Sequence, residues 1–179
     1  DEQTALQIGM SFDTFVLERW IRDRDVFVST ASDLGAEVNV QNANGDADEQ
    51  ASQIEYLIDK GMDVLVIVAV DGTSNALESA IKRAHSKGIK VLAYDRIIQN
   101  ANVDLYASFD NEEVGTLMAE SVLSQIPENG KIAALYGSPA DYNVVLVEQG
   151  IKKNLDGKMH NWFMRIMRIT GRQNMPTIK

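Results

Sequence analysis

Three predicted helices end at a glycine that stands just before an apolar segment. The glycines are Gly35, Gly61 and Gly88, and the segments are 36–41, 63–70 and 89–94. Glycine readily adopts the left-handed conformation that closes many helices. The continuous apolar run DVLVIVAV (63–70) is typical of a parallel strand that is buried on both faces. Helices and strands that alternate in this way predict an α/β fold with a doubly wound parallel sheet and right-handed crossovers.

The same alternation continues to residue 154. Further strands are expected at 6–12, 103–109 and 131–137. Two of the three helices that end at a glycine are expected at 50–60 and 73–87, and further helices at 111–126 and 144–154. The first helix is expected to begin at a cap formed by Asp13 or Thr14, and Asp110 or Asn111 is expected to cap the helix at 111–126. We expect residues 5–109 to form one lobe whose strands lie parallel in the order 2-1-3-4-5.

Composition and charge exclude several classes of function. Among the 179 residues there is no run of 18 apolar residues, which excludes a membrane span, and no cysteine, which excludes disulfides and a cysteine nucleophile. The net charge of −9 includes a basic segment, 158–179, with five Lys or Arg and no acid, so residues 1–157 carry −14. Such an acidic body disfavours nucleic acid as a partner. The start at Asp1, without a signal-peptide pattern, suggests a mature or trimmed chain.

The sequence carries no motif for phosphate, metal or nucleophilic chemistry. Neither G-x-G-x-x-G nor G-x-x-x-x-G-K-[ST] occurs, and the two histidines, His85 and His160, are far apart. His85 is interpreted as a solvated helix residue. We therefore expect no cofactor, no metal and no enzymatic activity.

Polar side chains follow most of the predicted strands, where ligands bind in open α/β sheets. They are Asp13 and Arg19, Asn42 and Asn44, Asp71, Asp95 and Arg96, Asp110 and Asn111, and Asp141 and Asn143. Carboxylate, amide and guanidinium groups suit a neutral polyol, because each hydroxyl both donates and accepts. In VLAYDR (91–96), Asp95 can accept from one hydroxyl while Arg96 donates to another. The alternatives are helix caps, turn formers and, for Asp95 and Arg96, a surface ion pair.

Six strings carry a family resemblance from about residue 5 to 157. They are IGMSFD, LERWIRDRDVF, DVLVIVAVDG, GIKVLAYDR, YASFDNEEVG and YGSPADYN. The chain resembles the periplasmic-type sugar-binding proteins of the ribose, galactose and xylose group, and most of all their xylose-binding members. The resemblance implies the type I periplasmic-binding-protein fold, in which two Rossmann-like lobes close over a pentose. Here it implies a complete first lobe (1–109), the start of a truncated second lobe (110–157) and an atypical basic tail (158–179).

The resemblance also implies which residues contact the sugar. They are Arg19, Trp20, Asp95 and Arg96 in the first lobe, and Asp141 and Asn143 in the second. Trp20 is expected to stack on the apolar face of the sugar, with a core position as the alternative. For Arg19 the alternative is an i,i+4 pair with Asp23. Tyr142 departs from the small polar residue expected beside Asp141.

The resemblance implies a periplasmic or extracellular protein that binds a pentose, D-xylose first, and delivers it to an ABC-transporter permease or a membrane sensor kinase. A membrane-anchored precursor and a homodimer through the truncated second lobe are further expectations. Three other classes stay open. They are an enzyme on a flavodoxin-like lobe, the effector domain of a sugar-responsive repressor, and a truncated lobe that acts as an interaction module.

Residues 158–179 differ from the rest of the chain, since they contain four of the seven methionines and no acid. One interpretation is a diverged terminus, and a second is an amphipathic helix with Trp162, Ile166 and Ile169 on one side. A third is translation in a shifted reading frame. Residues 170–179 can be back-translated into codons that, when read from one base earlier, encode a different sequence. That sequence contains a Trp followed by an acidic segment and resembles the corresponding part of the family.

Overall fold

The computed structural model describes residues 5–127, 130–137, 141–155 and 162–167. The chain divides into two compact units, residues 1–109 and residues 110–179. Each unit is described below by itself, beginning with the larger one.

A five-stranded parallel sheet forms the centre of the first unit. Its strands are β1 (Gln7–Phe12), β2 (Glu37–Asn42), β3 (Val64–Ile67), β4 (Lys90–Tyr94) and β5 (Leu105–Ala107). They lie in the order β2-β1-β3-β4-β5, and every neighbouring pair is parallel. The predicted strand order is confirmed. The carboxyl ends of β1, β3 and β4 therefore lie at one edge, where the polar residues of the candidate site follow them.

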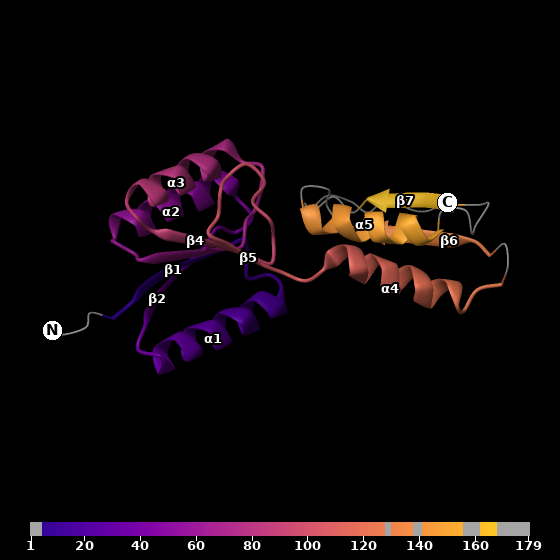
Figure 1. Ribbon diagram of the computed structural model, residues 1–179, viewed down its shortest axis with the longest axis horizontal. Helices are drawn as coiled ribbons and strands as arrows, with labels where there is room; N and C mark the ends of the chain where they lie inside the picture. The colour runs from indigo at the N-terminus through magenta and orange to yellow at the C-terminus, as the bar shows by residue number, and fades with distance from the viewer. Residues whose placement is uncertain (1–4, 128–129, 138–140, 156–161, 168–179) are drawn as a thin grey trace. The chain divides into compact units, whose positions relative to one another are not determined.

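Helices cover both faces of this sheet (Figure 1). The helix α1 (Glu18–Asp33) packs on one face, and α2 (Ala47–Asp59) and α3 (Asn75–Ser86) pack on the other. Phe12, Ile54 and Leu65 are among the fully buried side chains of the two resulting cores. Gly35, Gly61 and Gly88 follow the three helices with φ values of +80°, +77° and +78°, as the pattern of glycines predicts.

The start of α1 differs from the prediction. The helix is preceded by Leu17, which makes no side-chain capping bond, so Asp13 and Thr14 do not cap it. Asp13 lies instead at the end of β1, where its carboxylate bonds Arg96. The other predicted cap is confirmed, since Asp110 accepts from the N–H of Glu113 at 3.0 Å.

The segment that leads into β5 is fixed by Asp104. Its carboxylate accepts from Lys90 Nζ at 2.7 Å and from the N–H of Val91 at 2.9 Å, and it lies 3.0 Å from Nε2 of His85. These donors, led by Lys90 and Val91, hold the pKa of Asp104 well below its usual range. His85 is, as expected, a partly solvated residue of α3, with 32% of its side chain exposed, and it also pairs with Asp104.

The lowered pKa of Asp104 predicts a loss of stability in acid. A carboxylate whose pKa is depressed by folding stabilises the protein above its unfolded pKa of about 4 and loses this effect as the pH falls toward the folded value. We expect Asp104→Asn to lower the free energy of unfolding by up to about 1 kcal/mol at pH 7, because the group is partly exposed. Denaturant unfolding between pH 7 and pH 2 should show this difference closing below about pH 4. Asp33→Asn controls for the loss of an exposed charge, and a difference that persists in acid would contradict the prediction.

Among its described residues, the second unit contains two helices and a two-stranded parallel sheet. Its elements are α4 (Asn111–Leu123), β6 (Ile132–Tyr136), α5 (Tyr142–Leu155) and β7 (Trp162–Met167). Ala119, Tyr136, Ile151 and Leu155 form its small core. The helices pack closely, because Cβ atoms added to Gly115 and Gly150 would lie 2.1 Å and 1.9 Å from backbone oxygens of the facing helix.

The tail does not form the proposed amphipathic helix over 162–167. These residues form β7, which pairs with β6, so the interpretation that places Trp162 and Ile166 on a helix is wrong there. Ile169, and residues 158–161 and 168–179 of the basic segment, lie outside the described residues. A strand and a helix both use apolar residues, which explains how this short run can be misassigned.

Candidate functional site

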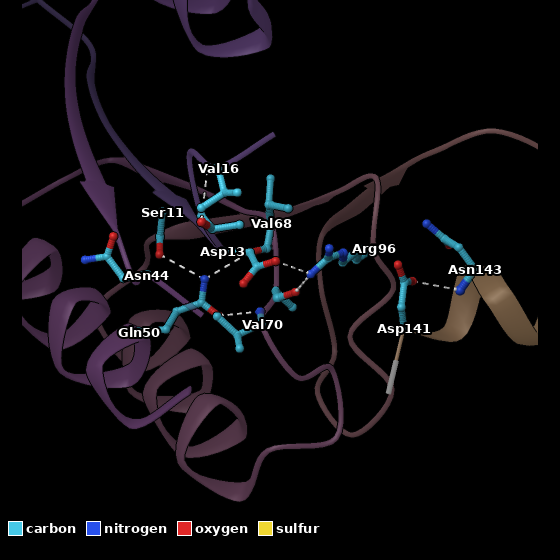
Figure 2. A network of polar contacts seen from close by, with 12 residues as sticks. Ser11, Asp13, Val16, Asn44, Gln50, Val68, Val70, Arg96, Asp141 and Asn143 are labelled. Carbon is cyan, nitrogen blue, oxygen red and sulfur yellow. Dashed lines mark hydrogen bonds and ion pairs between the residues drawn. The ribbon is translucent and has the colours of Figure 1, made fainter. Parts of the chain in front are cut away.

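Arg96 joins the ends of three neighbouring strands. It follows β4, and its Nη1 donates to Oδ2 of Asp13 after β1 at 2.7 Å and to the carbonyl of Ala69 after β3 at 3.0 Å (Figure 2). The side chains of Arg96 and Asp13 are only 17% and 12% exposed. This ion pair is therefore largely buried at the edge of the sheet where β1, β3 and β4 end.

Asp95 bonds an arginine of the facing helix. Its buried carboxylate accepts from Nη2 of Arg19, near the start of α1. Arg19 also lies 3.5 Å from Asp23, which in turn accepts from the hydroxyl of Tyr94 at 3.0 Å. Burial lowers the pKa of Arg19, but the bond to Asp95 and the charges of Asp95 and Asp23 outweigh it, so the pKa lies above its ordinary value. The alternative pairing with Asp23 therefore coexists with the contact to Asp95.

The two ion pairs run crosswise, because Arg19 pairs with Asp95 and Arg96 pairs with Asp13. The alternative interpretation of Asp95 and Arg96 as a surface ion pair with each other differs from these contacts, in which each residue pairs with a residue of the β1–α1 segment. Four charged side chains from the β1–α1 segment and the β4 end nevertheless meet at one edge of the sheet. Asp13, which the sequence places among the strand-end polar residues or as a helix cap, belongs to this cluster, although the resemblance does not include it among the sugar-contacting residues.

Trp20 lies in the core beneath the charged residues. It is 2% exposed, packs against Phe12 with ring centroids 6.2 Å apart, and carries the Arg19 guanidinium 4.5 Å above its ring. Its Nε1–H is buried without a hydrogen-bond partner among the described residues. Stacking of Trp20 on a sugar stays a prediction, and it requires the Arg19 guanidinium to leave the ring face.

Gln50 fixes the loops from which this edge is built. This buried residue of α2 donates to Ser11 Oγ at 3.1 Å and to the carbonyl of Val68 at 3.0 Å, and it accepts from the N–H of Val70 at 2.8 Å (Figure 2). Three bonds from one amide hold the ends of β1 and β3 at a fixed spacing. The sequence pattern placed Gln50 only at the start of a helix and gave no sign of this role.

The other polar residues of the first unit form turns. Asn42 accepts from the N–H of Asn44 at 3.1 Å, and Asp71 accepts from the N–H of Thr73 at 2.8 Å. Such bonds from Asn and Asp to backbone two residues on are typical of turn formers. Their alternative reading as turn residues is therefore supported by the geometry.

Asp141 and Asn143 lie at the start of α5 in the second unit. Asp141 Oδ1 accepts from the N–H of Asn143 at 3.0 Å, as Figure 2 shows, and Asn143 Oδ1 accepts from Nδ2 of Asn111 at 3.1 Å. Asn111 therefore orients the Asn143 amide from α4. The contact between these residues and a ligand stays a prediction.

The first unit thus presents two guanidinium groups and two carboxylates at one edge of its sheet, from the ends of β1 and β4 and the start of α1. Such groups bind hydroxyls through charge-assisted hydrogen bonds, which are shorter and stronger than neutral ones. Within the described ranges, no group of three or more His, Asp or Glu side chains could hold a metal ion. Across those residues, no helix combines the length and the apolar character that crossing a membrane requires.

An open parallel α/β sheet with polar side chains at its strand ends defines a ligand-binding class of fold. Residues 8–171 match the family model described as a periplasmic binding protein domain. The chain therefore belongs to this family.

Named relatives are similar over most of the chain. The D-xylose-binding periplasmic protein of Haemophilus influenzae is 51% identical over 84% of this chain and 45% of its own length. The protein of the same name from Escherichia coli is 48% identical over 84% of this chain and 44% of its own length. The chain thus spans less than half the length of these two relatives.

Solved structures show the same fold. An ABC transporter solute-binding protein from Clostridium phytofermentans, with bound β-D-glucose, has a TM-score of 0.76 and 34% identity, and the match covers 83% of this chain and 47% of that one. A carbohydrate transporter solute-binding protein from Chloroflexus aurantiacus, in complex with D-glucose, has a TM-score of 0.76 and 30% identity, with coverage of 90% and 48%. The predicted type I periplasmic-binding-protein fold, present in part, is confirmed.

Proposed function

We propose that this chain is part of an extracytoplasmic solute-binding protein that binds a pentose, with D-xylose as the preferred ligand. The observation that carries the proposal is the crosswise set of ion pairs, Arg19 with Asp95 and Arg96 with Asp13. The hydroxyls of a neutral sugar can replace these contacts, and each charged group then still has a hydrogen-bond partner. The names of the relatives from Haemophilus influenzae and Escherichia coli support D-xylose as the sugar.

In this proposal the first lobe, residues 1–109, supplies Arg19, Trp20, Asp95 and Arg96. Asp141 and Asn143 of the second lobe complete the contacts. The chemistry is reversible binding without turnover, and no cofactor takes part. The protein acts in the periplasm or outside the cell, where it delivers the sugar to an ABC-transporter permease, with a membrane sensor kinase as the alternative recipient.

Titration with sugars tests the proposal. Each charge-assisted hydrogen bond contributes roughly 1.5–3 kcal/mol, less where water reaches it, and immobilising the sugar opposes this gain. We therefore expect D-xylose to bind this partial chain with a dissociation constant on the order of millimolar. Calorimetric or NMR titration with D-xylose, D-ribose and D-glucose measures the preference, with glycine as a ligand that lacks hydroxyls. Failure of all three sugars to bind would refute the proposed function.

We also propose that the second unit mediates self-association. Leu117 and Met118 on α4 and Leu135 on β6 are 56%, 51% and 70% exposed, although parallel sheets are normally covered on both faces. A groove of about 350 Å³ between α4, β6 and α5 includes Met118 and Leu135 in its lining. A second copy of the same unit would remove these apolar side chains from water.

Sedimentation measures this association. The unmodified chain is expected to form dimers at micromolar concentration, and the double variant Leu117→Lys, Leu135→Lys is expected to be a monomer because burying two ammonium groups is unfavourable. Val26→Lys, at an exposed apolar residue of α1, is the matched control and should leave the dimer unchanged. A monomeric unmodified chain would contradict the proposal.

A further inference from the structure

Asp95 adopts a backbone conformation that is uncommon for residues other than glycine. Its φ is +63°, and the N–H of Arg96 donates to the carbonyl of Tyr94 at 2.7 Å. This bond closes a three-residue γ-turn with positive φ at its centre, a rare and strained form. A strained residue persists where the surrounding structure holds it.

The turn explains how two consecutive residues serve one site. In a regular strand, successive side chains point to opposite faces. The γ-turn interrupts this alternation directly after β4, and both Asp95 and Arg96 bond residues of the β1–α1 segment, namely Arg19 and Asp13. The crosswise ion pairs therefore depend on the conformation of Asp95.

Residues 106–108 hold both backbone polar groups of Asp95. Its N–H donates to the carbonyl of Ala107 at 2.7 Å. Its carbonyl accepts from Ser108 Oγ at 2.7 Å and from the hydroxyl of Tyr106 at 3.3 Å. The bond from Ser108 is the shorter of the two hydroxyl contacts, so it constrains the carbonyl more strongly.

We propose that Ser108 is a positioning residue of the sugar site, whose hydroxyl holds the γ-turn at Asp95 and thereby aims the Asp95 carboxylate at Arg19. This inference rests on the proposed function. Without the hydroxyl, the strained turn relaxes toward extended backbone in part of the population, and the carboxylate leaves the geometry that binds a hydroxyl. The apparent dissociation constant for the sugar rises as the fraction of molecules that hold the Asp95 carboxylate in the binding geometry falls.

Three variants test this role by NMR titration with D-xylose. Ser108→Ala is expected to weaken binding about five- to tenfold, as the loss of one hydrogen bond would. Ser108→Thr keeps a hydroxyl and should restore most of the affinity. Ser79→Ala is the matched control, because Ser79 Oγ also donates to a backbone carbonyl, that of Asn75 at 2.8 Å, within α3. It should leave binding unchanged.

Amide hydrogen exchange distinguishes positioning from general stability and needs no sugar. In Ser108→Ala the N–H of Arg96, which closes the turn, should exchange faster, while amides in β1 and β3 keep their protection. Tyr106→Phe removes the longer bond to the Asp95 carbonyl and should raise the exchange rate of the Arg96 N–H by a smaller amount. If Ser108→Ala does not fold, Tyr106→Phe takes its place in the test.

The outcomes are separable. If the unmodified chain binds D-xylose and Ser108→Ala binds it equally well, the inference fails and the proposed function stands. Unchanged exchange of the Arg96 amide would also overturn the inference. If the unmodified chain binds no sugar, the proposed function fails and the positioning role fails with it.

Discussion

Arg96→Ala is expected to abolish detectable binding of D-xylose. Nη1 of Arg96 bonds both Asp13 and the carbonyl of Ala69, so its loss removes a donor to the sugar and the link between three strand ends. With a starting dissociation constant on the order of millimolar, the loss of one charge-assisted bond moves binding beyond the range of an NMR titration.

The same substitution also lowers the stability of the first unit. Asp95 keeps Arg19 as its partner, and it is Asp13 that loses a cation. Asp13 is 8% exposed, so its carboxylate then lies in a poorly solvated position. We expect the free energy of unfolding of the first unit to fall by about 2 kcal/mol. Circular dichroism should still show a folded protein.

Two variants separate the role of Arg96 from general effects. Arg83→Ala removes an arginine that also bonds two partners, Glu55 and Asp59, on the surface of α2 and α3, and it should leave D-xylose binding unchanged. Arg96→Lys keeps the charge but loses the planar fork, and it should bind more weakly than the unmodified chain. Normal binding by Arg96→Ala would mean that this arginine serves only the structure.

The fold of the first unit could be predicted because its signals are local. Gly35, Gly61 and Gly88 mark helix ends by their backbone freedom, and the apolar run at 63–70 marks the buried central strand. The handedness of parallel crossovers then leaves few arrangements of such strands. These rules do not depend on knowing which side chains meet.

The pairing of the charges could not be predicted, because it depends on geometry that no pattern encodes. Sequence adjacency suggested Asp95 with Arg96, but the γ-turn at Asp95 directs the two side chains to different partners. The sequence predicts a helix cap at Asp13 or Thr14, but α1 begins later, after Leu17, and Asp13 bonds Arg96 instead. The contributions of Gln50 and Ser108 also depend on tertiary contacts. Gln50 bonds Val68 and Ser11, which lie 18 and 39 residues away, and Ser108 bonds Asp95, 13 residues away.

Gly150→Val is expected to unfold the second unit and leave the first unit intact. A Cβ atom at residue 150 would lie 1.9 Å from the carbonyl oxygen of Glu112 and 2.8 Å from the N of Thr116. Both are backbone atoms of α4, so a branched side chain fits only if the two helices separate. We expect the free energy of unfolding of this unit to fall by more than about 3 kcal/mol, because its core is small and the clash is with backbone.

NMR of methyl groups and denaturant unfolding measure the two units separately. Signals from Val66 and Ile67, in the first unit, should keep their positions, while those from Val147 and Ile151 should collapse toward unfolded values. Gln149→Val is the matched control, since it adds the same branched residue at an exposed neighbouring position of α5. Because Arg19, Asp95 and Arg96 all lie in the first unit, Gly150→Val should still bind D-xylose, within about tenfold of the unmodified chain. Complete loss of binding with an intact first unit would mean that the second unit, and not the crosswise ion pairs, supplies the decisive contacts.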